Sequence, residues 1–111
     1  MELTLLVIRS AIPEQLAEFY TTLGIAFEHH RHGTGPYHYS GHIGATLLEI
    51  YPMAKGQEQP DITLRLGLAV DAFDEIIGRL NALDTIFHQP PSRLMAVISD
   101  PKGRKIELYR K

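Results

Sequence analysis

Nine residues near the C-terminus, Asp100-Pro101-Lys102-Gly103-Arg104-Lys105-Ile106-Glu107-Leu108, carry most of the information on the fold. The Asp-Pro-x-Gly order is typical of a tight turn. The residues that follow predict a last strand in which one acid, Glu107, lies between apolar neighbours. The same arrangement occurs in the middle of the chain, where Glu49 and Tyr51 occupy the places that Glu107 and Tyr109 occupy at the end. A strand with one acid between apolar residues therefore occurs twice in the chain.

A second pattern repeats with it. Apolar residues at helical spacing occur once in each half of the chain: Leu16, Phe19, Tyr20 and Leu23, then Phe73, Ile76, Ile77 and Leu80. Two matches at nearly one offset favour an internal repeat. We predict an α+β fold of two βαβββ modules, at about 1–54 and about 61–111, within a single domain over 1–111. Proline, glycine and polar residues over 52–60 predict the linker between them.

The individual elements follow from alternation, helical spacing and turn residues. Gly24 is expected to end the first helix, and Asp71 to cap the second one at its N-terminus. Gly33 to Pro36 is expected to form a hairpin turn. The expected strands cover Leu3–Arg9, Ile25–His32, Tyr37–His42, Thr46–Tyr51, Ile62–Val70, Asp84–Gln89, Arg93–Ser99 and Arg104–Arg110.

Composition excludes several classes of function. The 111 residues are 44% hydrophobic and 22% charged, with a formal net charge of −2, so no broad basic field for nucleic acid is present. The absence of cysteine excludes disulfides, zinc–thiolate sites and cysteine nucleophiles. No signal peptide and no apolar stretch of membrane-spanning length are found. We therefore expect a cytoplasmic protein with neither a nucleic-acid nor a membrane partner.

Four segments together resemble one known family. They are Glu18 to Gly24, His32 to Tyr39, Leu48 to Pro52, and Asp100 to Leu108. The chain resembles the glyoxalase/bleomycin-resistance/dioxygenase proteins, the vicinal-oxygen-chelate superfamily, over nearly its full length. The resemblance implies paired half-sheets around a cleft. It does not imply one function, because the superfamily includes lyases, dioxygenases, transferases and drug binders.

The resemblance also implies a place for a metal ion. Members similar to glyoxalase I bind a divalent ion with ligands from the first and last strands of each module. The last-strand positions here are Glu49 and Glu107, whereas the first-strand positions fall near Leu5 and Arg65. Leucine has no lone pair, and arginine stays protonated, so neither can be a ligand. We expect no metal cofactor; if a divalent ion binds, Glu49 and Glu107 are its candidate ligands.

Arg65 suggests a replacement for the metal. A guanidinium between Glu49 and Glu107 would pair both acids in an internal network. A metal site, or two acids that face solvent, are the alternatives. Arg65 could also anchor a ligand carboxylate, and so could Arg9, whose other interpretation is a solvated strand end. Tyr51 and Tyr109 either line the cleft or serve in packing.

Five of the six histidines lie close together in sequence: His29, His30, His32, His38 and His42. The favoured interpretation places them on the solvent side of a hairpin; a ligand-contacting His38 and a metal cluster are the alternatives. His38 is the strongest single candidate for a cavity-facing residue, and near Glu49 it could act as a general acid or base. Glu49, Glu107 and His38 are therefore the candidate catalytic residues.

Two functions compete. The first is a small-molecule binder with a degenerate metal site, and it rests on the missing first-strand ligands. The alternative is a metal-dependent or acid/base lyase, isomerase or dioxygenase, and it rests on the two retained acids and the histidines. A homodimer is expected, because family members with two modules commonly share their cleft between chains.

Overall fold

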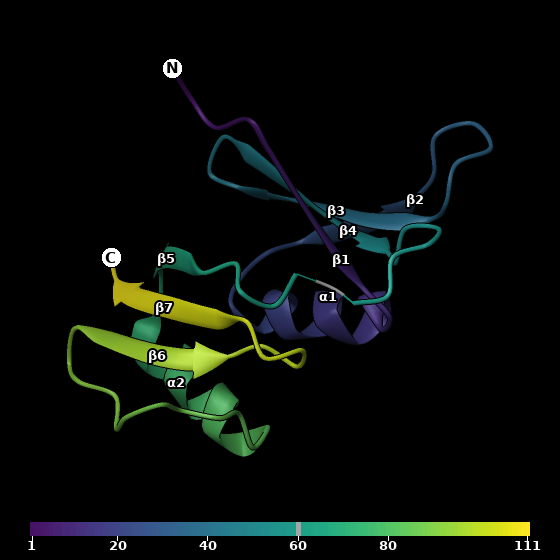
Figure 1. Cartoon of the computed structure of the whole chain (residues 1–111). Helices are drawn as coiled ribbons and strands as arrows, with labels where there is room; N and C mark the ends of the chain where they lie inside the picture. Colours follow the sequence, from purple (N-terminus) through teal and green to yellow (C-terminus); the bar gives the residue numbers. More distant parts are fainter. Residues whose placement is uncertain (60) are drawn as a thin grey trace. The chain divides into compact units, whose positions relative to one another are not determined.

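The computed structural model describes residues 1–59 and 61–111, and these form two compact units (Figure 1). Unit 1 comprises Met1–Thr21 and Ile25–Asp61, and unit 2 comprises Thr22–Gly24 and Ile62–Lys111. Among the described residues, no helix is long and apolar enough to cross a membrane.

Unit 1 is a four-stranded mixed sheet with a helix on one face. Its elements in chain order are β1 (Leu5–Ser10), α1 (Pro13–Thr22), β2 (Phe27–His30), β3 (His38–Ile43) and β4 (Thr46–Pro52). The strand order is β1-β4-β3-β2, with β1 parallel to β4 and the other pairs antiparallel. The connection between the parallel strands β1 and β4 runs through α1, β2 and β3. This is the predicted βαβββ topology.

Alternation along β4 divides its side chains between two environments. Leu48 and Ile50 are fully buried, as are Leu16 and Tyr20 on the apolar stripe of α1. Because successive strand residues point to opposite faces, Glu49 points away from the face that packs against the helix. The core of unit 1 therefore fixes the side of the sheet on which Glu49 and its cross-strand neighbours lie.

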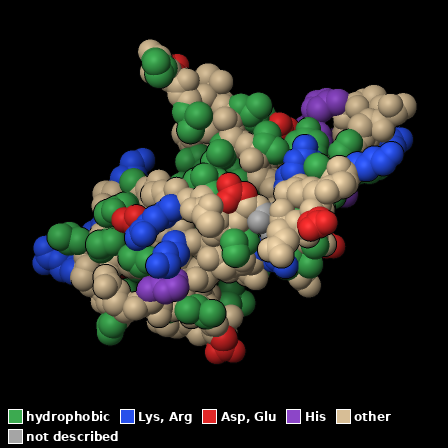
Figure 2. Space-filling view, in the orientation of Figure 1, with side chains coloured by type: hydrophobic (Ala, Val, Ile, Leu, Met, Phe, Trp, Pro, Cys, Tyr) green, Lys and Arg blue, Asp and Glu red, His purple; other side chains and the backbone are tan. Residues whose placement is uncertain are grey.

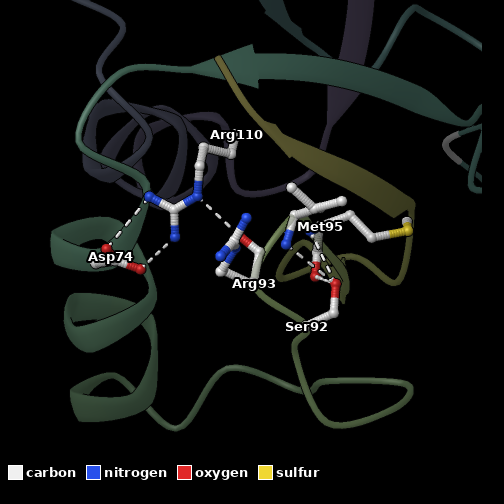
Figure 3. Close-up of polar contacts among 6 residues, drawn as sticks. Asp74, Ser92, Arg93, Met95 and Arg110 are labelled. Atoms are coloured by element: carbon white, nitrogen blue, oxygen red, sulfur yellow. Dashed lines mark hydrogen bonds and ion pairs between the residues drawn. The ribbon is translucent and has the colours of Figure 1, made fainter.

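Unit 2 repeats this plan with a smaller sheet. Its elements are β5 (Leu66–Val70), α2 (Phe73–Ala82), β6 (Met95–Ser99) and β7 (Lys105–Arg110), and the strand order is β5-β7-β6. Arg110 joins the end of β7 to the first turn of α2, because its guanidinium donates to both oxygens of Asp74 at 2.6 and 3.2 Å (Figure 3). The hydrogen bonds from Arg110 lower the pKa of Asp74.

Three sequence predictions in unit 2 are wrong in detail. The expected strand Asp84–Gln89 is reduced to a single bridge between Phe87 and Ile98, and prolines that follow it lack the N–H needed to extend a ladder. The first strand begins at Leu66 and not at Ile62. The N-cap of α2 is Ala72, which has a left-handed backbone (φ 52°) and no side-chain cap, in place of Asp71.

The turn motif at the C-terminus closes on a buried ion pair. The Asp100 carboxylate accepts the backbone N–H groups of Lys102 (2.8 Å) and Arg104 (3.1 Å). Its other oxygen lies 3.3 Å from Nη1 of Arg104, and both side chains are 0% exposed. Gly103 supplies the left-handed backbone of the turn, with φ 92°. The sequence signature therefore marks a turn that a buried ion pair holds in the core of unit 2.

Candidate functional site

The strand register of unit 1 places polar side chains side by side on one face of the sheet. His30 lies opposite His38 in the β2–β3 pair, and Ser40 lies opposite Glu49 in the β3–β4 pair. Residues directly opposite each other share a face, and so do residues two apart along one strand. All four side chains therefore project from the face that faces away from the core.

Glu49 is the centre of this group. Its carboxylate accepts a hydrogen bond from Ser40 Oγ (2.9 Å to Oε2), and Nε2 of His38 lies 3.0 Å from the same oxygen. Nε2 of His30 lies 2.9 Å from Ser40 Oγ. Because the single Ser40 proton is donated to Glu49, His30 Nε2 is the donor to Ser40. His38 is 1% exposed and Glu49 is 8% exposed, so a buried carboxylate is surrounded by two imidazoles and a hydroxyl.

The His38 ring lies close to Pro36, Glu49 and Tyr51. Its Nδ1 lies 3.2 Å from the carbonyl oxygen of Pro36. A carbonyl only accepts, so Nδ1 carries the proton, and in the neutral ring Nε2 is a lone pair directed toward Glu49. Nε2 has no aligned hydrogen-bond partner among the described residues. The ring also stacks on Tyr51, with centroids 4.2 Å apart and planes 7° from parallel.

A fourth side chain completes a cluster that could hold a metal ion. Ligand atoms of His30, His32, His38 and Glu49 all lie within 4.8 Å of one another. The imidazoles are close as rings, with centroid separations of 4.7 Å for His30–His38 and 5.3 Å for His32–His38. Imidazole nitrogen with one carboxylate oxygen is a donor set that suits zinc, nickel, iron and other transition ions.

A pocket of about 390 Å³ opens beside this cluster. Histidine side chains are visible over the β2–β3 end of unit 1 (Figure 2, purple, upper right). Apolar groups occur in the same wall as the acids and imidazoles, and the lining includes Phe27, His30, His32, Ser40, Leu47 and Glu49. A concave volume of this size, mostly apolar with a few polar groups, is typical of small-molecule sites.

Arg9 and Tyr51 extend the polar group toward β1. The Arg9 guanidinium carbon lies 5.0 Å from the centroid of the Tyr51 ring, and Nη1 donates to the carbonyl oxygen of Pro52 at 3.1 Å. Tyr51 therefore has His38 stacked on it and a cation near it. The structure thus connects three residues singled out in the sequence, Arg9, Tyr51 and His38, into one contiguous row.

Unit 2 holds the other predicted residues in a separate network. Arg65 Nε donates to Oε2 of Glu107 at 2.7 Å, and the Tyr109 hydroxyl donates to Oε1 at 2.6 Å. The hydrogen bonds from Tyr109 and then Arg65 lower the pKa of Glu107, and the same bond to Glu107 raises the pKa of Tyr109. The structure thus pairs Arg65 with Glu107, while a bridge from Arg65 to Glu49 stays a prediction.

The metal ligands that the sequence resemblance implies do not fit these residues. Val7 lies opposite Glu49 in the β1–β4 register, and Gly67 lies opposite Glu107 in the β5–β7 register, so the positions beside both acids lack ligand atoms. Both oxygens of Glu107 are already engaged by Tyr109 and Arg65. The structure instead groups Glu49 with histidines of its own unit.

The sequence singled out His38 and Glu49, which the structure brings together, but it did not indicate the contacts that Ser40, His30 and His32 make beside them. The favoured interpretation, solvent-side histidines, is wrong for His38, which is buried, and half wrong for His30, which is partly buried. It agrees with the exposure of His29, His32 and His42. The sequence did contain a signal for this grouping. His30 and His32 before the Gly33–Pro36 turn, and His38 and Ser40 after it, are two residues apart, and alternate residues of a strand lie on one face.

Comparison with known proteins identifies the fold. No family model and no curated protein matches the sequence. Among solved structures, the antibiotic-binding protein TnmS3 from Streptomyces sp. CB03234 is similar at 22% identity, over 99% of this chain and 95% of that one, with a TM-score of 0.74. The trypanothione-dependent glyoxalase I of Leishmania major is similar at 18% identity, over 99% and 86%, with a TM-score of 0.76.

A third solved structure with this architecture is the oxidase ChaP-H2. It is 17% identical to this chain, the alignment covers 100% of this chain and 94% of that one, and the TM-score is 0.72. Likeness at such low identity shows the fold and not the activity. The chain therefore has the fold that these proteins share, and the fold expected from the sequence is confirmed.

Proposed function

Because the chain has the vicinal-oxygen-chelate fold, which antibiotic-binding proteins and enzymes share, we propose that it binds a small organic molecule in the pocket of unit 1. The observation that carries the proposal is the buried Glu49 carboxylate in the wall of a cavity of about 390 Å³. A buried carboxylate is costly unless it is paired or recognises something. A ligand that donates a hydrogen bond to Glu49 offsets this cost, and the need for such a donor makes binding selective.

The lining residues indicate the chemistry of the ligand. Phe27 and Leu47 offer apolar surface, whereas Glu49 offers a negatively charged acceptor. His30 and Ser40 are engaged with each other, which keeps their side chains in place. A ligand of matching chemistry has an apolar or aromatic body and one hydrogen-bond donor or positive charge. TnmS3, with the same fold, binds an antibiotic, and this supports a binding role for the pocket.

Thermal-shift screening of a compound library tests the proposal. The screen uses wild-type protein in EDTA, so that stabilisation reports on the organic molecule alone. Glu49→Gln should lose the stabilisation by the hits, because the charged acceptor is gone. Glu107→Gln is the matched control, since Glu107 holds the equivalent strand position in unit 2 and does not line this pocket. Hits that stabilise wild type and Glu49→Gln equally would place the binding site elsewhere.

A second candidate function is acid/base catalysis, and one contact favours it. His38 Nε2 lies 3.0 Å from Glu49 inside the site, so an imidazole and a carboxylate could exchange a proton with a bound molecule. Glu107 is less suited to the catalytic role expected from the sequence, because Tyr109 and Arg65 occupy both of its oxygens. Mass spectrometry of screening hits after incubation with wild type and His38→Gln distinguishes turnover from reversible binding.

We also expect a homodimer, because the helix of each unit covers one face of its sheet and leaves the other face to find a partner. Light scattering coupled to size-exclusion chromatography measures the assembly directly. A mass of one chain at all concentrations would contradict this expectation and leave the binding proposal unaffected.

A further inference from the structure

We propose that unit 1 alone binds a divalent transition-metal ion, with His30, His32, His38 and Glu49 as its ligands. The metal site adds to the proposed function, and it rests on that function only because both use the same pocket. It differs from the set that the sequence resemblance implies, which draws ligands from both modules. Here every ligand comes from β2, the segment after it, β3 and β4.

His38 is already arranged as a metal-bound histidine. Metal-ligating histidines commonly donate their second ring N–H to a backbone carbonyl, and this orients the ring and fixes its tautomer. The Pro36 carbonyl oxygen takes that role at 3.2 Å from Nδ1. Nε2, the other ring nitrogen, is buried without an aligned hydrogen bond and faces Glu49 at 3.0 Å. A cation between these two acceptors satisfies both.

Glu49 is oriented as well. Ser40 donates to its Oε2 at 2.9 Å, and His30 in turn holds Ser40 at 2.9 Å. A hydrogen bond to a ligating carboxylate fixes its geometry before the ion arrives. Because Ser40 and Glu49 are cross-strand neighbours, the β3–β4 register sets this contact. The acid is therefore held in place by the sheet and does not depend on a flexible loop.

The distances require a small movement by the most mobile ligand. Ligands of a tetrahedral zinc ion are roughly 3.3 Å apart at ordinary Zn–N and Zn–O lengths. The four candidate atoms lie within 4.8 Å of one another, so the cluster must contract by about an ångström or more. His32 follows the end of β2 and its side chain is exposed, so it can rotate inward. His30 and His38 are already fixed opposite each other by strand pairing.

The charges select the class of metal. Three neutral imidazoles and one carboxylate carry a single negative charge, which a divalent ion more than neutralises. Magnesium and calcium prefer sites made of oxygen ligands, and they are poorly matched to three nitrogens. Zinc, nickel, cobalt and iron(II) accept this donor set. The ion then lies in the wall of the pocket, where a molecule bound there could reach it.

Metal titration of untagged protein tests the inference. Protein stripped with EDTA and dialysed is titrated with Zn²⁺ by calorimetry and with Co²⁺ by visible absorption. We expect one ion per chain. His38→Gln should weaken binding by at least about 100-fold, since losing a ligand costs more than losing an outer-shell partner. His29→Gln is the matched control, because His29 precedes His30 on β2 but lies outside the cluster, and it should bind like wild type.

His32→Gln adds a variant whose folding is not in question, because the His32 side chain is exposed. It should also weaken Zn²⁺ binding, by at least about 10-fold. Equal affinity in wild type, His32→Gln and His38→Gln, or no uptake of either ion, would overturn the metal site. Screening hits in EDTA would then still support the proposed function. Stoichiometric metal binding without any organic ligand, with or without Zn²⁺, would instead overturn the proposed function alone.

Discussion

His38 faces Glu49 through Nε2 at 3.0 Å while its other ring nitrogen faces the carbonyl oxygen of Pro36 at 3.2 Å. The carbonyl requires the proton on Nδ1, so in the neutral ring two acceptors, a nitrogen lone pair and a carboxylate, meet in a buried place. This arrangement is unfavourable without a cation or a further proton between them. The relationship makes Glu49 a residue whose substitution can stabilise the protein.

Glu49→Gln should raise the stability of metal-free protein by about 1 kcal/mol. A glutamine amide nitrogen at the same place can donate to both His38 Nε2 and Ser40 Oγ, and the buried charge disappears. Urea unfolding in EDTA measures the change. A marked loss of stability would show that Glu49 pairs with a protonated His38.

Gly41→Ala should destabilise the protein by about 1–3 kcal/mol. A Cβ at this position would lie 2.6 Å from the Ala26 carbonyl oxygen and 2.7 Å from Ile25 Cγ2. The carbonyl oxygen belongs to the backbone, so it can move away only if the chain shifts. Gly78→Ala is the control, because it lies within α2 with nothing near the added atom. It should stabilise the protein by roughly 0.5–1 kcal/mol. Equal effects in urea unfolding would contradict the close approach at Gly41.

Asp100→Asn should cost about 3–5 kcal/mol of unfolding free energy, because it removes the negative charge from a buried ion pair with Arg104. Asp74→Asn is the comparison, since it removes an acid from another arginine pair whose carboxylate side chain is 80% exposed. Its loss should be much smaller, because water replaces an exposed partner. A small loss for Asp100→Asn would mean that the turn relaxes and admits water.

Glu107 should make the stability depend on pH. Hydrogen bonds from Tyr109 and Arg65 lower its pKa in the folded protein. Its contribution is therefore complete above the pKa of the unfolded chain and is lost as the pH falls through the folded pKa. Glu107→Gln should be less stable than wild type at about pH 7 and equal to it well below the folded pKa. Urea unfolding across this range measures the difference.

Tyr109→Phe serves as the control for that prediction. It removes the first of the two donors to Glu107 and leaves Arg65 in place. Its pH profile should lie between those of wild type and Glu107→Gln. A Glu107→Gln profile parallel to wild type at every pH would contradict the assigned cause of the shift.

Much of the fold was readable because it depends on local periodicity. The helical spacing in Leu16 to Leu23 and the alternation around Glu49 depend on backbone geometry that neighbouring residues share. The strand expected over Asp84–Gln89 failed for the opposite reason. Its apolar residues are strand-like, but pairing depends on a partner and on backbone N–H groups that the following prolines lack. The cap at Ala72 could not be predicted either, because alanine has no side-chain oxygen and carries no capping signal in the sequence.

The sequence alone indicated the repeat and the fold, and it singled out Glu49, Glu107, His38 and Arg65 as candidate site residues, because these follow from residue type and spacing. Tertiary structure decided the partners. The β2–β3–β4 register brings His30, His38 and Glu49 together, and residue spacing alone does not say which of their atoms will meet. Burial then decides that His38 faces an acid in a site shielded from water, while Glu107, with the same strand context, binds an arginine and a tyrosine.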